Sequence, residues 1–366
     1  MQLSSVLLTA AGLLVPVYSS AIISIGRRFE GLNVSLSSIG HSKVQVSVTN
    51  TGSSEISVLK ANTLFDSYPT KKFIVYKEGS RKEVSFEGVH LRRSPSDLTI
   101  DDLQLIGPGQ TIDKKFDLAE TLNLSESGTY IVSTDGVFPV IDPKSPSIAG
   151  VIPYKSNELK IKVDGKQVSS ILSTRAKIYN HFTRRSDFNN GNCTDHQKAV
   201  IASALKRASS IAGEASNVAL SGDVRVFQQY FRTTDPSIRQ HVSDRFRAIS
   251  NEACSAEGGL VKYQCDDGME VCRPGTVAYA LSRSNVVVNC PIYYSVAAVS
   301  QACDAGDQAL TVIHELSHID AVYYPATTDL AYGEGASMAL SADMAVRNAD
   351  SYTFYANAVR QNCTPS

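Results

Sequence analysis

The first half of the chain alternates polar and apolar residues with the two-residue period of a β-strand. Residues 43–48 (KVQVSV) and 159–163 (LKIKV) place an apolar side chain at every second position, as strands with one buried face do. Turn-forming residues such as 107–109 (GPG) and 164–165 (DG) punctuate these segments. Several short strands at this spacing predict an all-β, sandwich-like unit over residues 21 to about 165.

The second half changes to helical periodicity. Residues 198–216 are rich in Ala and repeat apolar positions at helical spacing, and residues 236–253 predict a second helix. Asp235 is in position to cap this second helix, with Pro236 at its first position. Two further helices are predicted near the end of the chain, over residues 337–349 and 351–359.

One segment of the second half favours a strand. Residues 284–296 (SNVVVNCPIYYSV) are rich in β-branched and aromatic residues, but Pro291 cannot donate a ladder hydrogen bond. The segment is therefore predicted to be an edge strand or a strand end, able to pair with an extended substrate; an ordinary core strand is the alternative. The whole pattern predicts an α+β fold, with an all-β unit followed by a mainly α unit that has a small β-sheet.

Composition and charge indicate a globular protein of two domains. The chain has 366 residues, of which 43% are hydrophobic and 19% charged, and its net charge of -1 argues against a nucleic-acid partner. The charge is uneven: residues 1–185 hold 22 Lys+Arg and 17 Asp+Glu, giving +5, and residues 186–366 hold 13 and 19, giving -6. These opposite charges allow the two halves to attract each other.

The N-terminus predicts secretion. Residues 3–17 (LSSVLLTAAGLLVPV) are apolar and uncharged, and small residues follow at 19–21. This stretch is too short to span a bilayer comfortably and is typical of a secretory signal peptide, which we place at residues 1–20. Because no other apolar stretch is long enough for a span, we expect an extracellular protein without a membrane anchor.

All seven cysteines lie at or after Cys193. Cysteines concentrated in one half of a secreted chain indicate a domain stapled by disulfides. The sequence spacing alone leaves their pairing open.

The strongest chemical signal is the run His314-Glu315-Leu316-Ser317-His318, an H-E-x-x-H pattern. Residues 307–319 (DQALTVIHELSHI) predict a helix, and positions i and i+4 of a helix share one face. Both imidazoles can therefore reach one metal ion, and two neutral histidine nitrogens suit zinc. The adjacent carboxylate of Glu315 can take a proton from a water molecule that the metal activates.

A catalytic zinc site usually needs a third protein ligand, and the residues after the motif offer two candidates. The metzincin pattern is excluded, because it requires Gly and His where the chain has Ala321 and Tyr324. Glu334 would serve as the ligand if a following helix brought it back to the metal. Asp329 would serve if the turn that follows Pro325 did so.

Around Asp329 the chain resembles the deuterolysins, or aspzincins, a family of secreted fungal zinc metalloendopeptidases. The family follows H-E-x-x-H with G-T-x-D-x-x-Y-G, and this chain reads A-T-T-D-L-A-Y-G over residues 326–333, with Ala326 in place of the first Gly. The resemblance covers most of residues 186–366, including the run 348–352 (NADSY). It implies a zincin-type protease fold for this half and one Zn²⁺ per chain. The implied zinc ligands are His314, His318 and Asp329.

The resemblance also assigns further roles. Glu315 is the implied general base, and Tyr332 is a phenol that donates a hydrogen bond to the developing oxyanion; a packing tyrosine is the alternative. The implied disulfides are Cys193–Cys265, Cys272–Cys290 and Cys303–Cys363. Cys254 is left over, and we interpret it as a buried free thiol.

A dibasic pair at Arg184-Arg185 lies between the two halves, just before the first cysteine. It suits a processing protease of the secretory pathway, which would make residues 21–185 a propeptide and residues 186–366 the catalytic domain. The propeptide would assist folding and block the site. Since residues 21–185 contain no cysteine, a thiolate cannot be the blocking ligand, and His41, His90 and His181 are interpreted as structural or surface residues.

Substrate preference has a candidate in Asp350. In relatives that cleave before lysine, an aspartate in the matching run lines the pocket after the scissile bond, and an acidic domain also favours basic protein or peptide substrates. Asp350 could equally cap the last helix. We expect a monomer. Two other classes stay open: a secreted binding module with a structural zinc, and a zinc hydrolase of another amide.

Overall fold

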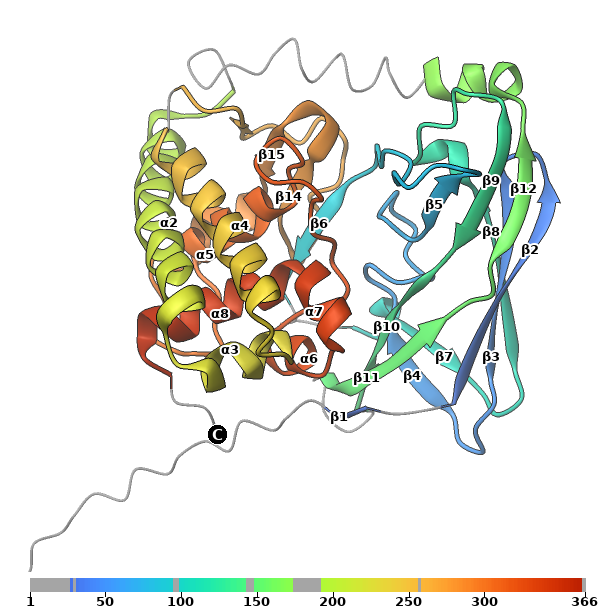
Figure 1. Cartoon of the computed structure of the whole chain (residues 1–366), viewed down its shortest axis with the longest axis horizontal. Coiled ribbons are helices and arrows are strands. Elements are labelled where there is room, and N and C mark those ends of the chain that lie inside the picture. Colours follow the sequence, from blue (N-terminus) through green and yellow to red (C-terminus); the bar gives the residue numbers. More distant parts are fainter. Residues whose placement is uncertain are drawn as a thin grey trace, which may run out of the picture.

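The computed structural model of the chain describes residues 27–28, 31–94, 99–142, 148–173, 192–255 and 258–363. These residues form an α+β structure, as predicted, and Figure 1 shows them arranged in two lobes. The strands of residues 27–173 make the β lobe, and the helices of residues 192–363 dominate the helical lobe. The predicted signal peptide, His181 and the pair Arg184-Arg185 lie outside the described residues.

The β lobe contains three sheets that surround one hydrophobic cluster. Their strand orders are β1-β11-β10-β4-β7, β12-β9-β5 and β2-β3-β8. The strands are β1 (Arg27–Arg28), β2 (Leu32–Gly40), β3 (Lys43–Asn50), β4 (Ile56–Leu59), β5 (Ile74–Lys77), β7 (Leu103–Ile106), β8 (Thr111–Asp117), β9 (Gly128–Ser133), β10 (Asp135–Ile141), β11 (Ile148–Lys155) and β12 (Leu159–Val163). Residues 165–173 are helical.

The alternating pattern of the sequence explains how these strands pack. In β3, Val44, Val46 and Val48 are fully buried, and the residues between them face outward or lie half-buried. The strand predictions for residues 43–48 and 159–163 are confirmed.

The helical lobe contains the helices α2 (Asp195–Ser221), α3 (Val224–Phe231), α4 (Pro236–Cys254), α5 (Gln308–Ser317), α6 (Glu334–Met338), α7 (Ala342–Arg347) and α8 (Ala349–Gln361). The carboxylate of Asp235 caps α4 by accepting from the amide of Ser237 at 2.7 Å, as predicted. The helix expected over residues 337–349 is divided into α6 and α7. The division falls at Ser341, whose side chain caps α7 and so starts a new helix.

A four-stranded sheet of order β13-β15-β14-β6 lies against these helices. Its strands are β13 (Lys262–Gln264), β14 (Thr276–Leu281), β15 (Val286–Asn289) and β6 (His90–Arg93). Of the readings left open for residues 284–296, the edge strand is wrong and the core strand is confirmed: β15 lies between two strands, with every residue buried, and the strand ends before Pro291, which begins a 3-10 turn.

The edge of this sheet is instead occupied by a strand from the other lobe. Figure 1 shows β6 reaching from the β lobe to β14. The two strands are antiparallel, with His90 opposite Ala280, Leu91 opposite Tyr279 and Arg92 opposite Ala278.

Three disulfides tie the helical lobe together: Cys193–Cys265, Cys272–Cys290 and Cys303–Cys363. These are the pairs that the family resemblance implied. Cys254 is free but exposed, so its interpretation as a buried thiol is wrong: it is the last residue of α4 and its side chain points away from the core.

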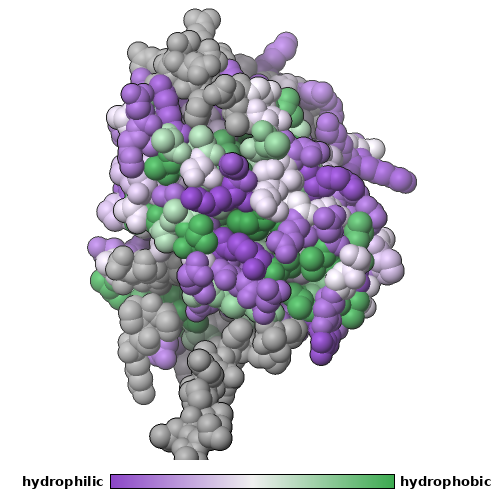
Figure 2. Space-filling view, turned by 90° about the vertical axis from the view of Figure 1, so that its left-hand side faces the viewer, coloured by the Kyte–Doolittle hydropathy of each residue, from purple (hydrophilic) through white to green (hydrophobic). Residues whose placement is uncertain are grey.

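On the outer face of the helical lobe in Figure 2, hydrophobic side chains lie scattered among hydrophilic ones. The apolar positions of α2, such as Ile201 and Leu205, face the core instead. In the described part of the chain, no helix combines the length and apolar character needed to cross a membrane.

Candidate active site

The helix α5 carries the H-E-x-x-H motif through the middle of the helical lobe. Asp307 caps it by accepting from the amide of Leu310 at 2.8 Å, and all ten residues of the helix are buried. The helix ends one residue before His318, whose amide still bonds to the carbonyl of Glu315 at 3.1 Å. Both histidines therefore remain on one helical face, as the spacing predicted.

The structure brings His314, His318 and Asp329 together. One oxygen of Asp329, Oδ1, lies 3.0 Å from His314 Nε2 and 3.2 Å from His318 Nε2. Both imidazoles are fully buried, and the side chain of Asp329 is 4% exposed. Of the two carboxylates considered for this position, the cluster contains Asp329, because Glu334 accepts a hydrogen bond from Tyr230 instead.

The outer nitrogens of both histidines are held by hydrogen bonds. His314 Nδ1 lies 2.8 Å from Asp350 Oδ1, and His318 Nδ1 lies 3.1 Å from the carbonyl of Thr327. With the proton on Nδ1, each ring directs the lone pair of Nε2 toward Asp329. Partners of this kind fix the orientation of metal-binding histidines in proteins.

The inner atoms have no such partners. His314 Nε2, His318 Nε2, Asp329 Oδ1 and both carboxylate oxygens of Glu315 are buried without a hydrogen bond. An unsatisfied buried polar group typically costs about 1–3 kcal/mol, so five of them in one place would be strongly destabilising unless they share a ligand. Two imidazoles and a carboxylate are a donor set that suits zinc.

The electrostatics of the cluster fit this donor set. Burial alone would raise the pKa of Asp329, but the His318 and His314 rings outweigh it and hold that pKa below its usual value, so the carboxylate is ionised. Burial raises the pKa of Glu315 to about 8, opposed by His314. Glu315 is thus a carboxylate that holds a proton more readily than an exposed one, as a general base near neutral pH must.

The loop that presents Asp329 is anchored by the start of α8. Asn348 Oδ1 accepts from the amides of Leu330 and Ala331, each at 3.0 Å, and the amide of Thr328 donates to the carbonyl of Arg347 at 2.7 Å. Ala326, the departure from the family pattern, is not among the residues with positive φ. Its Cβ therefore introduces no backbone strain in this turn.

Tyr332 and Asp350 both contact the strand β6 of the other lobe. The Tyr332 hydroxyl donates to the carbonyl of Leu91. Asp350 Oδ1 lies 3.2 Å from Arg92 Nη1, and its other oxygen accepts from the amide of Gly333 at 2.8 Å. The N-cap of the last helix is Asn348, so the interpretation of Asp350 as that cap is wrong.

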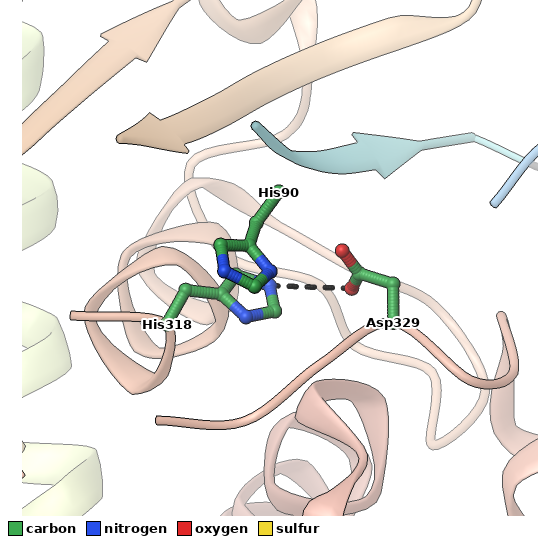
Figure 3. Close-up of side chains that lie close together, drawn as sticks. All are labelled: His90, His318 and Asp329. Carbon is green, nitrogen blue, oxygen red and sulfur yellow. Dashed lines mark ion pairs between the residues drawn. The ribbon is translucent and has the colours of Figure 1, made fainter. Parts of the chain in front are cut away.

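The structure adds a residue that sequence reasoning missed. His90 is buried in the site, and its ring stacks on that of His318 with centroids 4.3 Å apart and planes 10° apart (Figure 3). One ligand atom each from His90, His318 and Asp329 all lie within 4.8 Å of one another. His90 is therefore neither isolated nor on the surface; His41, by contrast, is exposed. No local pattern marks His90, because a strand pairing distant in sequence brings it here.

Comparisons with known proteins agree with this geometry. Residues 2–363 match the deuterolysin metalloprotease (M35) family. The chain is 86% identical over 366 residues, the full length of both chains, to a neutral protease 2 homolog of Blastomyces gilchristii. It is 39% identical over 340 residues to neutral protease 2 of Aspergillus oryzae, covering 92% of this chain and 94% of that one. A probable neutral protease 2 homolog of Arthroderma otae is 36% identical over 356 residues.

Proposed function

The chain belongs to the deuterolysin metalloprotease (M35) family and is a zinc metalloendopeptidase, and on this premise we propose that His314, His318 and Asp329 hold the zinc. The observation that carries the proposal is the set of buried, unpartnered atoms that these three side chains direct toward one point. When bound, zinc supplies Lewis acidity that polarises the scissile carbonyl and makes a water molecule more acidic.

The other residues of the site have separate roles in peptide hydrolysis. Glu315, beside the two histidines on α5, takes a proton from the attacking water and delivers it to the leaving amine. Burial raises the pKa of Glu315, which favours its holding the proton between these two steps. Tyr332 donates its hydroxyl proton in a hydrogen bond to the developing oxyanion once β6 no longer occupies it. Asp350 is a positioning residue that fixes the ring of His314.

A substitution of Glu315 tests these roles. In the processed protein, Glu315→Gln should lower kcat/KM on casein by about a hundred- to ten-thousandfold, because it removes the proton acceptor and keeps the side-chain shape. Zinc content, measured by atomic absorption, should stay at the wild-type level. Unchanged proteolysis would sink the role of Glu315, and loss of zinc would show that the variant disrupts the site itself.

We further propose that the chain is made as a secreted preproenzyme. Residues 1–20 are the signal peptide, residues 21–185 the propeptide and residues 186–366 the catalytic domain, with processing at Arg184-Arg185. The two largest hydrophobic clusters, each drawn mainly from one lobe, and the confinement of the disulfides to the second lobe support this division. The N-terminal sequence of the mature protein tests it, with a start near Ser186 expected.

Protein or peptide substrates follow from the endopeptidase activity, and we propose that basic ones are preferred. The pairing of Asp350 with Arg92 supports a site that accepts a guanidinium or ammonium group, and the zinc-bearing half of the chain has the acidic charge balance. We propose that the mature enzyme acts as a monomer.

A further inference from the structure

We infer that strand β6 is a built-in inhibitor and that the imidazole of His90 is a zinc ligand in the uncleaved chain. The inference rests on the proposed zinc site and adds a fourth protein ligand, supplied by the β lobe. Zinc sites that serve only structure are closed by four protein ligands, whereas catalytic sites keep one position for water or substrate. His90 would convert the open site of the helical lobe into a closed one.

The first observation is how β6 binds. It extends the sheet of the helical lobe at β14, in antiparallel register from His90 opposite Ala280 to Arg93 opposite Thr276. Adding a strand to a sheet edge is a common way for proteins to bind an extended peptide. Among the described strands, β14 has no neighbour on this side other than β6. The strand therefore occupies the edge that an extended substrate would need.

The second observation is what each residue of β6 meets. The Leu91 carbonyl accepts a hydrogen bond from the Tyr332 hydroxyl, the group assigned to the oxyanion. The guanidinium of Arg92 lies 3.2 Å from Asp350, and these side chains are 9% and 6% exposed. A buried ion pair of this kind is costly to break from one side. Backbone and side chain of β6 thus occupy groups that catalysis requires.

The third observation is the position of His90 itself. Its ring is nearly parallel to the ring of His318. The ring of Phe86 packs against His90 in a T-shaped contact, with the centroids of these two rings 5.0 Å apart. One ligand atom of His90 lies within 4.8 Å of ligand atoms of His318 and Asp329, so its imidazole is within reach of a metal ion that these two residues hold (Figure 3).

The approach of His90 is also rigid. The amide of Val89 donates to the carbonyl of Pro69 at 3.0 Å, and a Cβ added at Gly88 would lie 2.0 Å from that same oxygen. Only glycine fits at position 88, so the turn before β6 packs directly on the backbone of the β lobe. This packing presents His90 at a fixed place, which lowers the entropic cost of an additional ligand.

The test uses the full chain with Arg184→Ala and Arg185→Ala, kept uncleaved and loaded with Co²⁺ in place of zinc. In this background His90→Cys should give a thiolate-to-cobalt charge-transfer band in the near ultraviolet, which appears only if residue 90 touches the metal. Ser37→Cys, exposed on β2, is the matched control and corrects for the free Cys254. Cobalt bound without the band in His90→Cys would overturn the inference.

A second variant separates coordination from packing. His90→Phe preserves a ring beside His318 but has no donor atom. In this variant, added azide should change the visible spectrum of the cobalt protein. A chelator should also remove zinc from it at least about tenfold faster. Spectra and release rates equal to those of the uncleaved parent would overturn the ligand role. If the parent bound no metal at all, the proposed zinc site itself would fail, which distinguishes the two ideas.

Discussion

The two lobes differ most in how they are held together. The helical lobe contains all seven cysteines and three disulfides, whereas the β lobe has no cysteine. Each lobe has one large hydrophobic cluster of its own, and the buried residues of the β lobe that join clusters of the helical lobe are Val89, Leu91, Val137 and Val151. The disulfides thus reinforce the lobe that holds the candidate zinc ligands, while the β lobe reaches the site through the strand β6.

The largest effect should come from removing a disulfide. Replacing Cys303 and Cys363 by Ser should cost the helical lobe about 2–5 kcal/mol of unfolding free energy, since the unfolded chain gains freedom. Because the chain has no Trp, urea unfolding can be followed by the circular dichroism of the helices and by tyrosine fluorescence. Only the unfolding transition of the helical lobe should move to lower urea concentration. An equal loss of unfolding free energy in the β lobe would show that the two lobes unfold as one unit.

A smaller effect is expected for Tyr332, where the lobes touch. In the processed enzyme, Tyr332→Phe should lower kcat about a hundred- to a thousandfold, because one donor to the oxyanion is lost. KM should change little. The same substitution in the uncleaved chain removes the hydrogen bond to Leu91. A kcat within a few-fold of the wild-type value would show that Tyr332 is a packing residue and does not bind the oxyanion.

Asp350 should show the smallest effect. Asp350→Asn keeps the shape but weakens the bond to His314 Nδ1, so zinc affinity of the processed enzyme should fall by about 10–100-fold in competition with a chelator. Arg92→Ala is the matched variant from the β lobe, and after processing it should have no effect on zinc affinity. An unchanged affinity in Asp350→Asn would assign this carboxylate to substrate binding alone.

Much of the helical lobe could be predicted from the sequence because its signals are local. The spacing of apolar residues and the cap at Asp235 identified α4, and the i, i+4 spacing placed His314 and His318 on one face of α5. The pairing of the cysteines came from family resemblance, since spacing alone left it open. The helix signals depend on residues a few positions apart, whereas the cysteine pairs are 72, 18 and 60 residues apart.

The contribution of the β lobe to the site could not be predicted in the same way. The segment 90–93 (HLRR) is short, charged and without alternation, and only its pairing with β14 makes it a strand. Tertiary pairing also decides between the alternatives for residues 284–296: Pro291 suggested an edge strand, but β15 ends before the proline and lies inside the sheet. Which strand occupies an edge is decided by tertiary contacts that no local pattern records.

X-ray absorption at the zinc edge, on uncleaved and processed protein, counts the imidazole ligands of the zinc in each form. If β6 closes the site, the ligands in the uncleaved chain are the imidazoles of His90, His314 and His318 with the carboxylate of Asp329, and processing lowers the imidazole signal from three rings to two. The lost imidazole should be replaced by a light oxygen scatterer. An equal number of imidazoles before and after processing would contradict the closure of the site by β6.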